Sequence, residues 1–149
     1  MPSITPSYLY SFVALLAVSS LLLFSFMAYA EALRFSSEVK QLKNLMDSLA
    51  AKGTELLTLT LAINATGEAY LQMPAVIGNK QYWLQIRNDS EKTWVEGGFG
   101  NIPIEETELR VYLPEEASAN GYFIGGHGAA HLKCYFEDDV LQILLESSS

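Results

Sequence analysis

The residues best suited to chemistry lie close together near the C-terminus: His127, His131, the single cysteine Cys134, and Asp138. Imidazole, thiolate and carboxylate groups are the usual ligands of zinc. This stretch is predicted to be a strand, however, and residues three apart on a strand point to opposite faces of the sheet. His131 and Cys134 could share a metal only across a bulge or a turn. We therefore expect no metal site here, and expect Cys134 to be a small buried hydrophobe or a free thiol.

Acidic and glycine-rich loops supply weaker candidates. Glu105-Glu106-x-Glu108 and Glu115-Glu116 offer oxygen ligands for Ca²⁺, but they lack the Asp-rich spacing and the glycine of a calcium loop. Solvated acidic loops are the better interpretation. Gly97-Gly98-Phe99-Gly100 has no G-K-[ST] after it and so does not match a phosphate-binding loop. Because no Ser/His/Asp grouping stands out either, the sequence predicts neither an enzyme nor a cofactor.

Two triplets match the acceptor pattern for N-glycosylation. They are Asn64-Ala65-Thr66 and Asn88-Asp89-Ser90, and both fall at predicted turns, where a glycan would be accommodated. Asn64 and Asn88 are therefore possible glycosylation sites, and they favour an exported domain.

The first element that could position these residues is an apolar helix. After a tail of residues 1–7, residues 8–30 contain no charged side chain and are predicted to cross a membrane. Tyr8 to Ala28, at 1.5 Å per residue, would span roughly 30 Å, the hydrocarbon thickness of a bilayer. The competing interpretation is a secretory signal cut after Ala28-Tyr29-Ala30. The length of the apolar run, and the absence of a basic residue before it, favour a retained anchor. Residues expected to meet lipid or sister helices are Phe12, Leu16, Leu23 and Phe26.

The helix is predicted to continue as an amphipathic segment over residues 31–60. Its apolar positions recur in alternating steps of four and three, the spacing of a packing seam. We expect this seam to pack against the protein's own domain or against a neighbouring copy of the helix. The seam consists of Phe35, Val39, Leu42, Met46, Leu49, Gly53 and Leu56. The polar side chains assigned to the opposite face are Glu31, Glu38, Lys40, Lys43, Asp47 and Lys52.

Residues 61–149 are predicted to form an acidic β-rich domain. Residues 31–60 hold four acidic and four basic residues and residues 1–30 hold none, so the net charge of −8 lies wholly in this part. A surface of that sign repels nucleic acid and anionic lipid. We expect an α+β fold in which a small antiparallel sandwich or meander packs around the end of the long helix. Leu56 to Ile63 fits either the helix end or a first strand. The predicted strands are Glu68–Met73, Gln81–Arg87, Thr93–Glu96, Glu108–Leu113, Gly121–Ile124, Ala129–Phe136 and Val140–Leu145.

The layout resembles that of archaeal type IV pilin-like proteins. In that family a hydrophobic N-terminal helix, amphipathic in its second half, leads into a small β-domain. The stretch from Leu71 to Leu84 (LQMPAVIGNKQYWL) is similar to an element of the family: a strand ending in Pro, then Ile-Gly, then a Tyr-bearing strand. The resemblance implies a structural membrane protein that assembles through its N-terminal helix. Residues 1–7 lack the basic leader of pilins, which favours a membrane-retained pilin-like subunit over a major pilin.

These observations predict a non-enzymatic, single-pass membrane protein that joins, or associates with, a cell-surface filament or envelope. Its partners would be membrane lipid and other pilin-like subunits, including copies of itself, and no nucleic acid. Arg34, Lys40 and Lys43 follow the span and favour a cytosolic domain, but the two glycosylation triplets, the acidic β-domain and the resemblance favour an extracellular one. The alternative is an exported β-sandwich that binds a ligand and has a simple anchor or a cleaved signal. Its ligand would meet Tyr122, Phe123 and the loops at Phe99 and His127.

Overall fold

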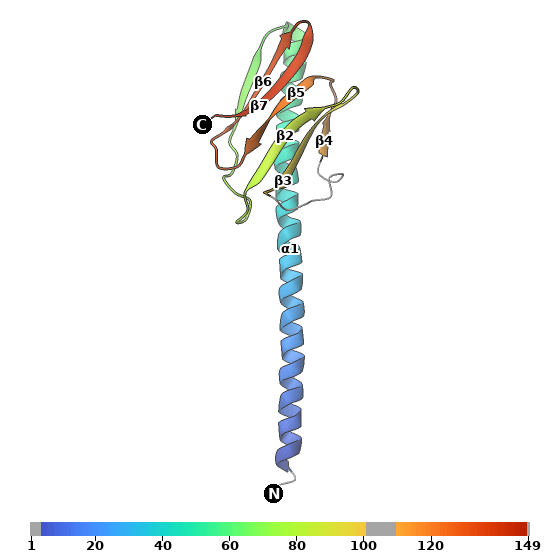
Figure 1. Cartoon of the computed structure of the whole chain (residues 1–149), viewed down its shortest axis with the longest axis vertical. Helices are drawn as coiled ribbons and strands as arrows, with labels where there is room; N and C mark the ends of the chain where they lie inside the picture. Colours follow the sequence, from blue (N-terminus) through green and yellow to red (C-terminus); the bar gives the residue numbers. More distant parts are fainter. Residues whose placement is uncertain (1–3, 101–109, 149) are drawn as a thin grey trace. The chain divides into compact units, whose positions relative to one another are not determined.

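The computed structural model describes residues 4–100 and 110–148 of the chain. These residues belong to two compact units, unit 1 (Met1–Ser37) and unit 2 (Glu38–Ser149). A single long helix, α1 (Ile4–Ile63), crosses from unit 1 into unit 2, and the strands follow it (Figure 1). The strands are β1 (Gly67–Leu71), β2 (Tyr82–Asn88), β3 (Thr93–Phe99), β4 (Arg110–Leu113), β5 (Ser118–Ile124), β6 (Ala130–Glu137) and β7 (Val140–Ser147).

The helix α1 continues through the stretch that sequence left open between helix and strand. The alternation of leucines after Leu56 matched a strand, but the chain is helical to Ile63. Asn64 ends the helix with a left-handed backbone (φ 51°), and its N–H donates to the carbonyl of Thr60 at 2.9 Å. This is a common way to end a helix, and asparagine tolerates it better than most residues. Leu56, Leu57 and Thr60 thereby extend the buried face of α1 by one more turn.

The strands form one mixed sheet in the order β1-β6-β7-β5-β2-β3-β4. The α+β class is confirmed, and each strand lies within three residues of its predicted ends. The expected antiparallel sandwich or meander is wrong in two respects. First, β5 and β7 pair in parallel, because the chain passes from β5 to β6 and the β6–β7 hairpin then returns β7 into the space between them. Second, α1 takes the place of a second sheet, since its buried face packs into the core (Figure 1).

Two of the turns between strands have well-defined geometry. Asp138 and Asp139 close the β6–β7 hairpin with φ values of 52° and 64°, the backbone of a two-residue type I′ turn that matches the twist of the strands. In the β2–β3 turn, the Asp89 carboxylate accepts hydrogen bonds from the N–H groups of Glu91 (2.8 Å) and Lys92 (2.7 Å). These two bonds lower the pKa of Asp89 below its usual value.

The core of unit 2 forms where one stripe of α1 meets the inner face of the sheet. Leu42, Met46 and Leu49 are fully buried, and Leu56 nearly so, at the predicted alternating spacing. The seam over these residues therefore packs against the protein's own sheet. A side chain at Gly97 would come within 3.2 Å of the Met46 sulfur, so glycine lets β3 approach the helix closely. Buried residues of the sheet that complete the core are Tyr82, Leu84, Ile86, Val95, Phe99, Phe123, Leu132, Ile143 and Leu145.

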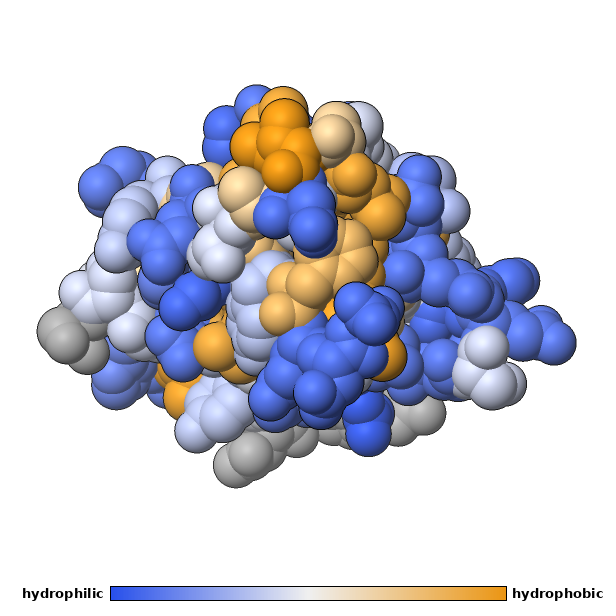
Figure 2. Space-filling view, turned by 90° about the horizontal axis from the view of Figure 1, so that it is seen from above, coloured by the Kyte–Doolittle hydropathy of each residue, from blue (hydrophilic) through white to orange (hydrophobic). Residues whose placement is uncertain are grey.

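The opposite side of α1 in unit 2 is exposed. Figure 2 looks down from the end where α1 terminates, and hydrophobic residues lie there among largely hydrophilic ones. The exposed hydrophobic side chains on this last part of the helix are Leu59, Leu61 and Ile63. The part of α1 in unit 2 therefore has both buried and exposed leucines. Substitutions at the two kinds of position can be compared to test which face forms the core.

Replacing Leu49 with Ala should lower the free energy of unfolding of unit 2 by about 2–5 kcal/mol, because it removes methyl groups from a fully buried site and leaves a cavity. The same change at Leu59, which is 49% exposed, should alter stability by only about 0.5 kcal/mol. Urea titration of the full chain in detergent micelles, followed by tryptophan fluorescence, measures both. Equal effects of the two substitutions would contradict this assignment of the buried face.

Candidate functional sites

The first candidate site is the apolar part of α1. This helix is long and apolar enough to cross a membrane, and none of its most apolar stretch is buried within the structure. The exposed side chains lie on every side of the helix from Tyr8 to Leu33. They include the four predicted contact residues of the membrane segment, Phe12, Leu16, Leu23 and Phe26.

The second site is a polar contact at the start of unit 2, between α1 and the loop before β2. Glu38, which is 3% exposed, pairs with Lys80 at 2.5 Å (Oε2 to Nζ). The assignment of Glu38 to the polar face of the helix is wrong. Glu38 lies four residues before Leu42 and so shares its buried face, a spacing visible in the sequence. Its burial is compensated by the opposite charge of Lys80, whose ammonium also lies 5.7 Å from the ring centre of Phe99.

The loop that carries Lys80 is held by residues of the stretch from Leu71 to Leu84. Ile77 is buried, and its N–H and carbonyl bond to the carbonyl and N–H of Lys80, both at 3.0 Å. Gly78 has φ +64°, and a Cβ there would collide with the Glu38 carboxylate. The Tyr82 hydroxyl donates to the carbonyl of Pro74 at 2.5 Å, and burial raises the pKa of Tyr82 to about 12. The Pro, Ile-Gly and Tyr of this stretch thus fix the loop against α1.

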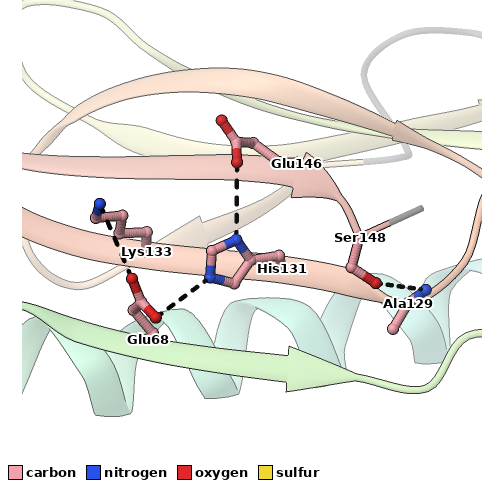
Figure 3. Close-up of polar contacts among 6 residues, drawn as sticks. All are labelled: Glu68, Ala129, His131, Lys133, Glu146 and Ser148. Atoms are coloured by element: carbon pink, nitrogen blue, oxygen red, sulfur yellow. Dashed lines mark hydrogen bonds and ion pairs between the residues drawn. The ribbon is translucent and has the colours of Figure 1, made fainter.

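The third site surrounds His131 on the outer face of β1, β6 and β7 (Figure 3). Its Nε2 lies 3.8 Å from a carboxylate oxygen of Glu68 on β1, and its Nδ1 lies 3.7 Å from one of Glu146 on β7. The ring also stacks on Tyr70, with the two ring centres 4.5 Å apart. Lys133 lies 3.9 Å from the other oxygen of Glu68. The cluster therefore links three adjacent strands.

The geometry of the His131 cluster suits a cross-strand contact. Glu68 and Glu146 face opposite nitrogens of the imidazole, so the three groups do not converge on one point. In residues 4–100 and 110–148, no three His, Cys, Asp or Glu side chains are grouped so as to hold a metal ion. A protonated imidazole has two N–H donors and can attract both carboxylates at once, whereas the neutral ring has one donor.

Cys134 lies on the other face of β6, as its spacing from His131 predicts. Its side chain is fully buried in the core, whereas His131 is only partly buried on the outer face. Burial raises the pKa of the Cys134 thiol to about 12, because the apolar surroundings disfavour the thiolate. Cys134 is thus a buried hydrophobe, and its low thiolate content makes it a poor nucleophile.

The other residues that the sequence singled out belong to an acidic loop, the two glycosylation triplets and the alternative ligand-binding surface. Glu105, Glu106 and Glu108 lie outside the described residues. Asn64 and Asn88 are exposed, but the Asn88 amide oxygen accepts a hydrogen bond from the Ala119 N–H at 3.0 Å. For the alternative ligand-binding surface, Tyr122 and His127 are exposed as expected. Phe123 is buried, so that part of the expectation is wrong, because strand alternation turns it toward α1. The Phe99 side chain is also buried, and most of the loop that follows it lies outside the described residues.

The fourth site is a hollow on the outer face of β2 and β5, for which sequence analysis named Tyr122 but missed the residues of β2. It has a volume of about 440 Å³ and is lined by Gln81, Trp83, Gln85, Tyr122 and Ile124, among others. The cross-strand register places Trp83 beside Ile124, and Gln85 beside Tyr122. The sequence signal was the alternation within β2, in which Trp83 and Gln85 take the opposite face from buried Leu84.

Comparison with known proteins gives no match: no protein-family model, no curated protein and no solved structure is similar to this chain.

The Cys134 thiol should resist alkylation by iodoacetamide at about pH 8 in the folded chain and should react once urea unfolds it, because it is buried and its pKa is raised. Keeping the thiol neutral stabilises the folded chain. This stabilisation is complete below the ordinary thiol pKa of 9.0 and is lost as the pH rises toward 12. Mass spectrometry measures the labelled fraction. A Lys133→Cys, Cys134→Ala variant moves the thiol to the outer face and should be labelled without urea. Rapid labelling of the folded parent chain would contradict the burial of Cys134.

Proposed function

We propose that this protein is a single-pass membrane protein of the type IV pilin-like kind, with a structural and non-enzymatic role. It assembles through its N-terminal helix into a cell-surface filament or envelope structure, or associates with one. The observation that carries this proposal is the exposure of apolar side chains on all sides of α1 from Tyr8 to Leu33, in a stretch that has no charged residue before Glu31.

Exposure on all sides favours lipid and neighbouring helices as the surroundings of this segment. An amphipathic surface helix buries one stripe and leaves the other side polar, whereas a helix that is apolar all round has no side suited to water. At about 25 cal/mol per Å² of apolar surface, leaving such a helix in water would be costly. A bilayer or a bundle of sister helices removes that cost.

The packing of unit 2 also limits where copies of the chain can meet. The seam from Leu42 to Leu56 is occupied by the protein's own sheet. Contacts between helices of different copies therefore fall in the membrane segment, where Phe12, Leu16, Leu23 and Phe26 are exposed. Phe35 and Val39 lie between this segment and the buried seam.

The side chains that could take part in chemistry make structural contacts instead. Cys134 is in the core, His131 bridges strands, and Glu38 pairs with Lys80. The pilin-like element from Leu71 to Leu84 likewise fixes a loop to α1. These uses support a structural role for the β-domain. We propose that it lies on the extracellular side of the membrane, on the basis of the two glycosylation triplets, its acidic charge and the pilin-like layout. If the domain is exported into a glycosylating compartment, Asn64 is the preferred acceptor, because its side chain forms none of the hydrogen bonds that hold Asn88.

Placing two arginines in the apolar segment (Leu16→Arg with Leu23→Arg) should reduce the fraction of protein that resists carbonate extraction from membranes. Each arginine costs about 2.5–3.5 kcal/mol at the centre of a membrane span. The matched control is Leu59→Arg with Leu61→Arg, at leucines of α1 that are 49% and 46% exposed. This control should leave membrane retention unchanged. Equal losses, or no loss in either variant, would contradict a membrane span in the N-terminal part of α1.

Replacing Tyr8–Met27 with an unrelated membrane span should preserve membrane insertion but abolish oligomers, because the specific side-chain packing between helices is lost. Cross-linking in membranes, followed by electrophoresis under denaturing conditions, measures the oligomers. A reversed order of the native residues of this stretch controls for hydrophobicity and should also fail to assemble. If the unrelated span leaves the oligomers intact, the pilin-like assembly is wrong even though the anchor remains.

A further inference from the structure

We propose that the outer face of the sheet binds a neutral oligosaccharide in the hollow beside Trp83 and Tyr122. This site lies on unit 2 and does not depend on the membrane role proposed above. Its volume of about 440 Å³ falls within the range of roughly 300–1,000 Å³ that is usual for small-molecule sites.

The aromatic floor of the hollow is held in place by a glycine. Gly98 on β3 is the cross-strand partner of Trp83. A Cβ at Gly98 would lie 2.8 Å from Cζ2 and 3.0 Å from both Cε2 and Nε1 of the Trp83 indole. One face of the indole therefore rests against the backbone of β3, in space that only glycine leaves open. An aromatic ring fixed in this way loses little conformational freedom when a ligand stacks on it.

The chemistry of the lining matches a sugar. Tyr122 is 62% exposed, and with Trp83 it offers flat apolar surface for the C–H face of a pyranose ring. Gln81 and Gln85 add side-chain amides, which both donate and accept hydrogen bonds, as sugar hydroxyls do. The Gln81 amide is oriented by a contact from its Nε2 to the carbonyl of Gly125 at 3.4 Å. A purely apolar ligand could form no hydrogen bonds with these amides.

The charges around the hollow favour a neutral ligand. Among the residues that the structure describes, its lining contains no Asp, Glu, Lys, Arg or His. The charged pair on the adjoining part of the same face, Arg87 and Glu96, is self-neutralised at 3.1 Å. The net charge of −8 on the chain disfavours acidic sugars.

A second hollow makes room for more than one sugar ring. It has a volume of about 410 Å³ and shares Tyr122 and Ile124 with the first, while His127 and Glu146 add polar groups. It forms where β5 leaves β7, after the last parallel pair at Gly121 and Leu145, and turns to β2. Tyr122 thus lies between two adjacent hollows, an arrangement that suits an oligosaccharide.

The test is calorimetric titration of the full chain in lauryldimethylamine oxide micelles, since sugar-based detergents would compete. The probes are cellotetraose, maltotetraose and mannotetraose, with tetragalacturonate as the acidic comparison. At least one neutral probe should bind with a Kd of about 1 mM or lower. Tyr122→Ala should weaken that binding about tenfold or more. Tyr70→Ala is the matched control, because Tyr70 is also 62% exposed on the same outer face but lies on β1. It should leave the Kd unchanged.

Three further variants separate the role of the aromatic rings from that of the amide. Gly98→Ala displaces the indole of Trp83 while retaining every aromatic residue, and Gln85→Leu removes an amide at similar size. Both should weaken binding, and Tyr122→Phe should retain most of it. The proposal is overturned if none of the three neutral probes binds, if tetragalacturonate binds as tightly as the best of them, or if Tyr70→Ala weakens binding as much as Tyr122→Ala.

Discussion

The packing of one stripe of α1 against the inner face of the sheet is the interaction on which unit 2 depends. Leu42, Met46 and Leu49 are fully buried there, and in the described part of the chain no second sheet covers that face. Two glycines set how closely the layers approach: Gly53 lies against Ile143 and Leu113, and Gly97 against Met46. Because a core of this size has few layers, the helix is an integral part of the β-domain and cannot be regarded as a separate stalk.

The two parts of α1 therefore have different surroundings. In unit 2 the apolar stripe of the helix is covered by the sheet, whereas in unit 1 apolar side chains are exposed on all sides. The change occurs around Glu38, the first residue of unit 2, whose buried charge is compensated by Lys80. A buried carboxylate is tolerated only with such a partner. The loop from Pro74 to Tyr82 carries Lys80, and it therefore helps to set the residue at which unit 2 begins.

Because side chains alternate along each strand, the inner face of the sheet forms the core and the outer face carries the proposed binding site. The inner side chains of β2, β5 and β6, such as Leu84, Phe123 and Cys134, form the core. The outer side chains of the same strands include Trp83, Tyr122 and His131, which line the hollow or bridge strands. Changes on the outer face can therefore alter binding without disturbing the core, because neighbouring residues on a strand point in opposite directions.

Most of the helix and strand segments of this protein follow from its sequence alone. The uncharged run in residues 1–30, the alternating seam from Leu42 to Leu56 and seven short strands all follow from local patterns of period, charge and turn residues. Three features arise only in the folded chain: the parallel pairing of β5 with β7, the contact of Glu38 with Lys80, and the hollow at Trp83 and Tyr122. Each of these brings together residues that are far apart in the chain. Periodicity reports which face of an element is apolar, but it carries no information about which element that face will meet.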